Sequence, residues 1–141
     1  MRIPLKAGEI IDFVRDIRNH WGNDPISIAE ICGIKVFASE AGTPSGSTIC
    51  MAGYPTIINL QGCISETAKR VLCAHELGHG LLHQDMTINR FNGTSKGIQE
   101  ECEYEANLFA VALLFDEDDF NRPLEDLSNW MLKTILDFNI Q

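Results

Sequence analysis

The segment Cys73–Asp85, CAHELGHGLLHQD, constrains the fold more than any other part of the chain. It holds three of the four histidines, His75, His79 and His83, each four residues from the next. Residues four apart lie on one face of an α-helix, with Cβ atoms about 5–6 Å apart. The spacing therefore predicts a helix that presents the three imidazoles as one stripe. We expect this helix to cover about residues 66–84, with Ser65 as its N-cap.

The first two histidines and the glutamate between them form the pattern H-E-x-x-H. Imidazoles at this spacing can bind one ion, with each nitrogen about 2.0–2.1 Å from it. Glu76 is rotated by about 100° from His75 around the helix axis, so it flanks the ion instead of binding it. From there it can accept a proton from water bound to the metal, whose pKa falls toward about 7. The alternative interpretation is a solvated helix face that happens to be rich in histidine.

A catalytic site of this kind needs a third protein ligand and an open fourth position. His83 lies a full turn beyond His79, so we expect it to have a structural or substrate-side role and not to bind the ion. A second long helix is expected at about residues 98–115, and it is rich in glutamate. Glu105 borders the apolar face of this helix and is the expected third ligand. Three further glutamates, with Glu103 pointing away from that face, are expected to be solvated: Glu100, Glu101 and Glu103.

The remaining sequence predicts a small sheet between helices. An amphipathic helix is expected at about residues 8–21, followed by a short one that Asp24 caps, Pro25 begins and Gly33 ends. Strands are expected at 34–39, 48–54 and 55–60, with a turn at 41–47, a loop at 85–97, and a last helix after Pro123. The predicted architecture is a single α+β domain over residues 1–141. Its three-stranded, mostly antiparallel sheet is expected to pack against the helix that bears the histidines and the helix that bears the glutamates.

Composition narrows the classes of function. The 141 residues are 45% hydrophobic and 22% charged, which is typical of one globular domain. The sequence contains neither a long apolar run nor the apolar core of a signal peptide, so we expect a cytoplasmic protein without a membrane segment. A net charge of −9 disfavours direct nucleic-acid binding. Five scattered cysteines without a C-x-x-C pair argue against disulfides or a cysteine zinc site, and predict buried thiols.

Two longer segments resemble the ImmA/IrrE family of small zinc metallopeptidases. They are ISETAKRVLCAHELGHGLLH and, after a gap, EYEANLFAVALL, and the upstream AEICGIKVF and TIINL are also similar, so the resemblance covers about residues 26–115. It implies a zincin-like fold in which His75, His79 and Glu105 bind one zinc ion and Glu76 is the general base. It further implies site-specific cleavage of helix-turn-helix repressors, in mobile elements or stress responses. The chain departs from the family at LLFDEDDF, where members often have Met-Pro, and we expect no fused helix-turn-helix, which some members carry.

We therefore expect a zinc-dependent endopeptidase whose substrate adds as a strand to an edge of the sheet, with residues 56–61 as one candidate edge. Donors for the oxyanion could come from Tyr54, Tyr104 or His83, and the sequence does not choose among them. Two alternatives stay open. A metal-dependent binding module would sequester a partner protein with little hydrolysis, and a purely structural zinc site would unfold when the metal is removed.

Overall fold

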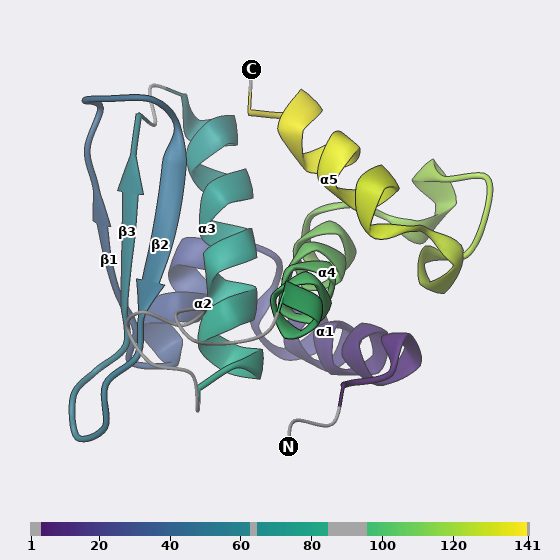
Figure 1. The fold of residues 1–141 in the computed structure, drawn as a ribbon, viewed down its shortest axis with the longest axis horizontal. Coiled ribbons are helices and arrows are strands. Elements are labelled where there is room, and N and C mark those ends of the chain that lie inside the picture. Colours follow the sequence, from purple (N-terminus) through teal and green to yellow (C-terminus); the bar gives the residue numbers. More distant parts are fainter. Residues whose placement is uncertain (1–3, 63–64, 85–95, 141) are drawn as a thin grey trace.

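The computed structural model describes residues 4–62, 65–84 and 96–140, and these residues form an α+β fold with five helices and a three-stranded sheet (Figure 1). The predicted α+β class with a three-stranded sheet is confirmed. The expected loop at 85–97 lies mostly outside the described residues, and Cys63 does too. The elements are α1 (Ala7–Trp21), α2 (Pro25–Ile31), β1 (Lys35–Ala38), β2 (Ser45–Ile49), β3 (Ile57–Gln61), α3 (Glu66–Leu82), α4 (Lys96–Leu114), two 3-10 turns (Glu117–Asp119 and Leu124–Asp126) and α5 (Asn129–Phe138).

The sheet is mixed, with strand order β1-β3-β2. β1 pairs parallel to β3, and β2 pairs antiparallel to it, so that Ile57 faces Lys35 on one side and Ile49 on the other. Along β3, Ile58 and Leu60 are buried while Asn59 and Gln61 are exposed, which is the alternation of a sheet with one face on the core. The expectation of a mostly antiparallel sheet is thus correct only for the β2–β3 pair.

Two strand predictions are wrong. β2 begins at Ser45, within the expected turn, and ends at Ile49, before most of the expected strand at 48–54. Pairing with β3 and packing on α3 override the weak β-propensity of Ser45, Gly46 and Ser47, because strand propensity depends strongly on context. β3 is the central strand, so residues 56–61 cannot offer a free edge for a substrate strand. The outer edges of the sheet belong to β1 and β2.

The helix termini follow their capping residues. The Ser65 side chain accepts a hydrogen bond from the Ala68 N–H at the start of α3, and Asp24 accepts one from Ser27 at the start of α2, as expected. Gly33 has φ +77°, which a glycine adopts without strain, and it follows the end of α2. The last helix begins later than expected, at Asn129, with Ser128 as its N-cap. Of the described cysteines, Cys73 and Cys102 are buried, Cys50 is partly buried and Cys32 is exposed.

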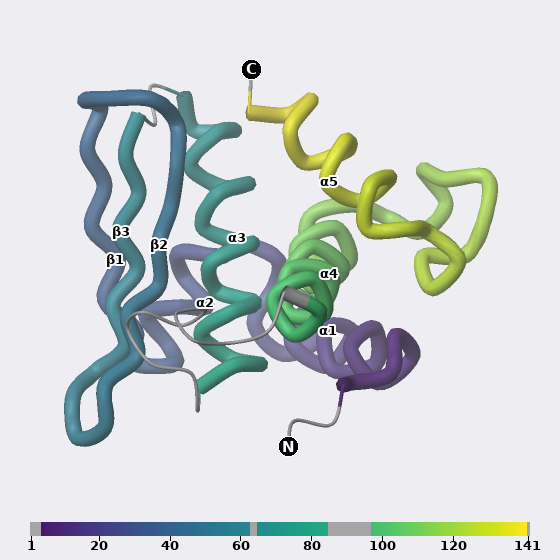
Figure 2. The backbone as a smooth tube through the Cα atoms, in the orientation of Figure 1, coloured from purple at the N-terminus to yellow at the C-terminus, as the bar shows by residue number. Residues whose placement is uncertain are grey.

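α4 is the central helix of the fold. α3 lies between the sheet and α4, and α1 and α5 pack on α4 from other sides (Figures 1 and 2). Consecutive residues 105–113 of α4 are all buried, so this part of the helix has no solvent-facing side. Helix α3 is also buried over most of its second half, at residues 76–80. The polar side chains on these stretches are therefore forced to find partners within the protein.

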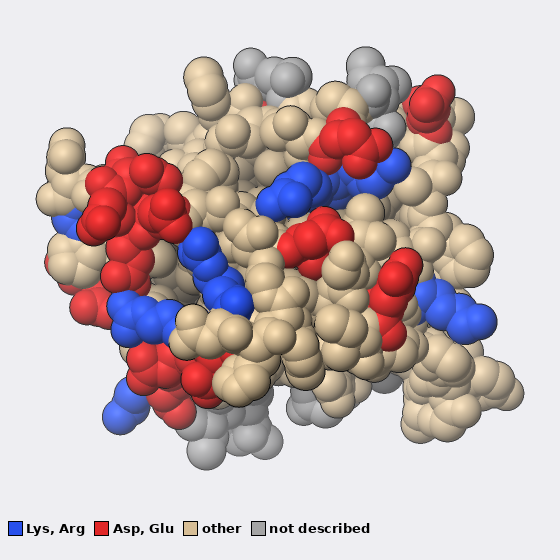
Figure 3. Space-filling model, turned by 180° about the vertical axis from the view of Figure 1, so that it is seen from behind, with Lys and Arg blue, Asp and Glu red and all other residues tan. Residues whose placement is uncertain are grey.

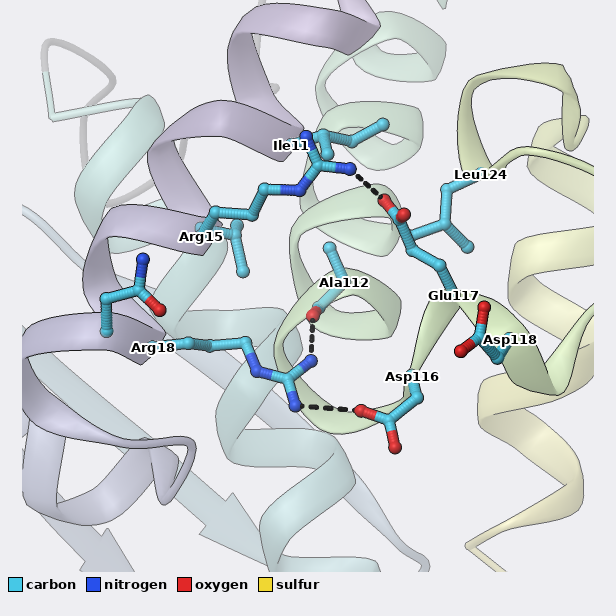
Figure 4. A pocket seen from close by; sticks show the side chains of 10 residues that line it. Ile11, Arg15, Arg18, Ala112, Asp116, Glu117, Asp118 and Leu124 are labelled. Carbon is cyan, nitrogen blue, oxygen red and sulfur yellow. Dashed lines mark hydrogen bonds and ion pairs between the residues drawn. The ribbon is translucent and has the colours of Figure 1, made fainter.

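Arg18 of α1 holds the C-terminal end of α4. Its guanidinium donates to the carbonyl oxygen of Ala112 at 3.0 Å and to the Asp116 carboxylate at 3.1 Å (Figure 4). It also donates to the carbonyl oxygen of Phe115 at 2.9 Å. These carbonyls lie where an α-helix has no further N–H groups to offer them. Arg15, one turn earlier, pairs with Glu117 at 2.6 Å (Figure 4). Asp116 and Glu117, which belong to the acidic segment LLFDEDDF, are thus bound to α1 by ion pairs.

The structure also shows how charged side chains are distributed on one face and how apolar the helices are. On the face shown in Figure 3, lysine and arginine side chains lie among aspartate and glutamate side chains and form no continuous basic surface. Among the helices of the described residues, none is both long enough and apolar enough to cross a membrane.

Candidate metal centre

The approach of α3 to α4 depends on Gly78. A Cβ atom at this position would lie 3.1 Å from the Cα of Ala106 and 3.2 Å from the Cβ of Phe109, closer than almost all real contacts. The missing side chain therefore lets the two helix backbones come close together. Gly78 lies between His75 and His79 in the sequence, so the close contact occurs at the level of the histidine pair.

Three potential ligands meet at this contact: His75 and His79 from α3 and Glu103 from α4. Their ligand atoms all lie within 4.8 Å of one another. The Glu103 carboxylate bridges the two rings, with Oε2 3.2 Å from Nε2 of His75 and Oε1 3.0 Å from Nε2 of His79. Two imidazole nitrogens and one carboxylate oxygen are a common ligand set of divalent metals in hydrolases, so this group fits a metal ion.

The bridging contacts shift the acid–base properties of the group. Burial acts to raise the pKa of Glu103, but the hydrogen bonds and charges of His75 and His79 outweigh it and hold that pKa far below its usual range. Burial acts to lower the pKa of His75, but the bond to Glu103 and the charges of Glu76 and Glu103 raise it above its usual value. The pKa of His79 is lowered, because burial and the charge of His75 outweigh the contact with Glu103. His79 therefore favours the neutral form that a metal ligand needs.

Glu76 lies beside the group with its carboxylate held from the sheet side. Its side chain is 5% exposed, and the Thr48 hydroxyl of β2 donates to Oε1 at 2.6 Å. Its other oxygen, Oε2, lies 3.9 Å from Nε2 of His75. Gly46 makes room for it, because a Cβ there would come within 2.9 Å of the Glu76 Cγ. β2 thus fixes where this carboxylate sits.

His83 and Glu105 form a second, deeper pair behind His79. Nδ1 of His83 lies 2.9 Å from Nδ1 of His79, and Nε2 of His83 lies 2.9 Å from Oε1 of Glu105. The other Glu105 oxygen accepts the backbone N–H of Leu5 at 3.1 Å. The side chains of His83 and Glu105 are each 2% exposed, so water scarcely reaches this pair.

Glu105 is buried, as expected, but the glutamate that approaches the histidine pair is Glu103. Glu105 contacts His83 and Leu5, whereas Glu103, expected to be solvated, contacts both His75 and His79. The physical reason is the burial of α4. At about 100° per residue, Glu103 lies about 60° and Glu105 about 100° from Ala106, on opposite flanks of the apolar stripe. Both glutamates border the apolar stripe, Glu103 partly exposed at 39% and Glu105 buried, so a position beside the apolar face did not identify the residue that approaches the histidine pair.

The two tyrosines considered as oxyanion donors lie elsewhere. Tyr54 is 69% exposed in the turn after β2. Tyr104 packs against the hydrophobic core, and burial together with the charges of Glu105 and Glu125 raises its pKa. Neither residue lines the pocket beside the histidine pair, as far as the described residues show.

Sequence reasoning missed several residues of the site. Asn107 of α4 hydrogen bonds to His75 and donates to Asn129 at 2.8 Å. It follows Glu103 by four residues, so the spacing rule that joined the histidines could have found it. No spacing pattern in the sequence pointed to Thr48 or to the α5 residues that line the pocket. The pocket beside the histidines has a volume of about 210 Å³, and its lining beyond the residues already described comes from Leu72, Lys133, Leu136, Asp137 and Ile140.

The sequence was compared with known protein families and proteins. Residues 29–137 match the model of the IrrE N-terminal-like domain, a peptidase family. A curated relative, Metallopeptidase ImmA of Bacillus subtilis (strain 168), is 26% identical over 109 residues, which cover 77% of this chain. The chain spans 63% of the length of that relative. No solved structure gave a significant match. The match covers all of α3 and α4, and the chain belongs to the family of IrrE N-terminal-like peptidase domains.

Proposed function

We propose that this chain is a zinc-dependent endopeptidase with a zincin-like active site, and that its substrate is a helix-turn-helix transcriptional repressor. The observation that carries the proposal is the placement of a buried carboxylate, Glu76, beside a group of two imidazoles and a carboxylate that fits a metal ion. Family membership and the curated relative named as a metallopeptidase support the same reaction class.

His75, His79 and Glu103 would hold the ion. Imidazole nitrogens with one carboxylate oxygen suit zinc among the common divalent metals. When bound, zinc supplies Lewis acidity, polarising the scissile carbonyl group and making water a stronger acid. The lowered pKa of Glu103 and the neutral form of His79 keep both side chains in the protonation states that ligands require.

Glu76 is the proposed general base. The Thr48 hydroxyl holds Oε1 at 2.6 Å, which fixes the plane of the carboxylate and leaves Oε2 on the side of His75. From this position Oε2 accepts a proton from the attacking water and later delivers it to the nitrogen of the leaving amine. The Thr48 hydroxyl restrains the carboxylate from the sheet side, where Gly46 leaves room for it, so Oε2 keeps one orientation in both transfers.

The substrate chain would lie between β2 and α5. β2 is an outer strand of the sheet and provides the Thr48 contact, so an extended segment added to its outer edge would run past Glu76. The pocket of about 210 Å³ would take one side chain of that segment between Leu72 of α3 and Leu136 of α5. Lys133 and Asp137, paired at 2.8 Å, line the same pocket.

The choice of a repressor as substrate rests on the family resemblance. A net charge of −9 is also favourable, because a DNA-binding protein presents a basic surface that such a chain would attract. We regard the partner as a protein and not a nucleic acid, since a net charge of −9 disfavours binding to nucleic acids.

Cleavage at low enzyme ratio tests the proposal. The zinc-loaded chain is mixed with a fifty-fold excess of a helix-turn-helix repressor from the same genome, and fragments are weighed by intact-mass spectrometry. We expect two fragments with the wild type and none with Glu76→Gln, which should still bind zinc. Glu66→Gln is the matched control, because Glu66 is an exposed residue of the same helix and should leave cleavage unchanged.

Two outcomes would favour the other functions. A repressor that stays intact but loses DNA binding only at equimolar enzyme indicates a sequestering module. A chain that unfolds when zinc is removed and cuts nothing when zinc is present indicates a structural metal site. Equal cleavage by the wild type and Glu76→Gln would remove Glu76 from the reaction.

A further inference from the structure

We infer that His83 and Glu105 are positioning residues, which act through His79 to set the proton of that ring for metal binding. The inference rests on the proposed metal centre, and neither residue is assigned to bind the ion. It explains why a third histidine follows at the same four-residue spacing. It also gives the buried carboxylate of Glu105 a role next to the metal ligands.

The contacts behind His79 form a path through the interior. It runs from His79 to His83, then to Glu105, and ends at the backbone of Leu5, with donor–acceptor distances between 2.9 and 3.1 Å. His79, His83 and Glu105 are between 1% and 2% exposed. Water scarcely competes for these contacts, so the protein determines how each ring is protonated.

The direction of the hydrogen bonds follows from the end of the path. An ionised carboxylate only accepts, so Glu105 requires a proton on Nε2 of His83. A neutral His83 then has a lone pair on Nδ1 and accepts from Nδ1–H of His79. In the metal-loaded chain, a neutral His79 with its proton on Nδ1 has its lone pair on Nε2, the nitrogen that faces the proposed metal position beside His75 and Glu103. Glu105 therefore selects the tautomer of His79 that can bind a metal.

Leu5 ties the path to the N-terminal segment. Its N–H donates to Oε2 of Glu105, which leaves Oε1 for His83. Glutamine at position 105 could not serve both contacts, because an amide has one oxygen acceptor and its NH₂ group only donates. Either Leu5 loses its acceptor, or an NH₂ group faces Nε2 of His83 and favours the wrong tautomer.

A purely structural role makes a different prediction. Glu105 would then stabilise the fold, and zinc affinity would be unchanged in any variant that remains folded. A role as an additional ligand also differs, because both ring nitrogens of His83 are engaged, one with His79 and one with Glu105.

The test measures zinc affinity of the full chain by competition with a chromophoric chelator, after circular dichroism has shown that each variant is folded. We expect Glu105→Gln to weaken zinc binding by about 10- to 100-fold, which is typical of the loss of a contact behind a metal ligand. Glu100→Gln is the control, since Glu100 is an exposed residue of the same helix, and its affinity should stay within about twofold of the wild type. A folded Glu105→Gln variant with wild-type affinity would overturn the inference.

A second measurement does not depend on any variant folding. Nitrogen-15 NMR of the zinc-loaded wild type reports which ring nitrogens carry protons. We expect the proton of His79 on Nδ1 and that of His83 on Nε2. A His83 proton on Nδ1 would overturn the inference.

The outcomes also separate this inference from the proposed function. A wild type that binds no zinc refutes the metal centre itself. A wild type that binds zinc but cuts no repressor refutes only the endopeptidase.

Discussion

Replacing Gly46 with alanine is expected to move Glu76 while leaving the metal ligands in place. Gly46 lies in β2 without a positive φ, so alanine adds no backbone strain. The new Cβ would lie 2.9 Å from Cγ and 3.3 Å from Oε2 of Glu76, whereas ordinary contact begins at 3.4 Å. Since Thr48 holds Oε1 of the same carboxylate, the side chain cannot simply turn away, and we expect it to shift by roughly half an ångström.

The expected effect is on the rate of cleavage. A misplacement of about 1 Å can cost about 100-fold in rate, so half that distance should cost about 10-fold, equivalent to about 1.4 kcal/mol in the barrier. Zinc affinity should stay within about twofold, because the three atoms nearest to the new methyl group all belong to Glu76 and none to a proposed ligand. Overpacking should also lower the stability of the fold by about 1–3 kcal/mol.

The assay is single-turnover cleavage of the repressor, with zinc-saturated enzyme in excess, followed by intact-mass spectrometry. Gly8→Ala is the matched control: a Cβ at Gly8 meets nothing within 4 Å, so its rate should equal that of the wild type. A Gly46→Ala enzyme that cleaves at the wild-type rate would refute the claim that β2 sets the position of the base. A loss of zinc binding in this variant would refute the separation of base from ligands.

Other predictions address neighbouring contacts. Thr48→Val keeps the shape of residue 48 but removes the hydroxyl that donates to the buried Glu76 carboxylate. It should slow cleavage and lower the free energy of unfolding by about 1.5–3 kcal/mol, measured by thermal denaturation. A variant with wild-type cleavage rate and wild-type stability would contradict this expectation. Gly78→Ala should weaken zinc binding, because the new methyl group presses α4 away from α3. Alanine favours the helical conformation over glycine by about 1 kcal/mol, so a weaker affinity would come from the contact and not from a loss of helix. Unchanged zinc affinity in the chelator competition would show that the helices need not be so close. Glu103→Gln should weaken zinc binding more than Glu105→Gln does, and the opposite order would restore Glu105 as the ligand. The pKa of Glu103 is lowered, so its contribution to the stability of the metal-free chain is present above about pH 4.5 and is lost as the pH falls further. In urea titrations of the metal-free chain, Glu103→Gln should therefore lose less stability than the wild type on acidification, and parallel losses would contradict the assignment.

Local patterns predicted the helices of the site well, because the information lies in neighbouring residues. Four-residue spacing identified the histidine stripe, and Ser65 marked the start of α3. The sheet was predicted less well. β2 begins in a run of small polar residues that favours a turn, and it forms a strand only because β3 and α3 are beside it. The Thr48 contact with Glu76 depends on that pairing, so no sequence pattern could have indicated it.

The two glutamates of α4 show where helical periodicity stops being informative. A hydrophobic stripe tells which side of a helix is buried when the opposite side faces water. α4 is covered by α3, α1 and α5, so its stripe marks no single neighbour, and Glu103 and Glu105 flank it almost symmetrically. The contact between Gly78 and Ala106 does mark one neighbour, because only small residues let two helix backbones approach so closely. Measured from Ala106, Glu103 is the nearer glutamate by about 40°. A pair of small residues on two buried helices, here Gly78 and Ala106, therefore marks the side on which each helix faces the other. The polar residues nearest to that side of the two helices are the ones that can share a metal ion.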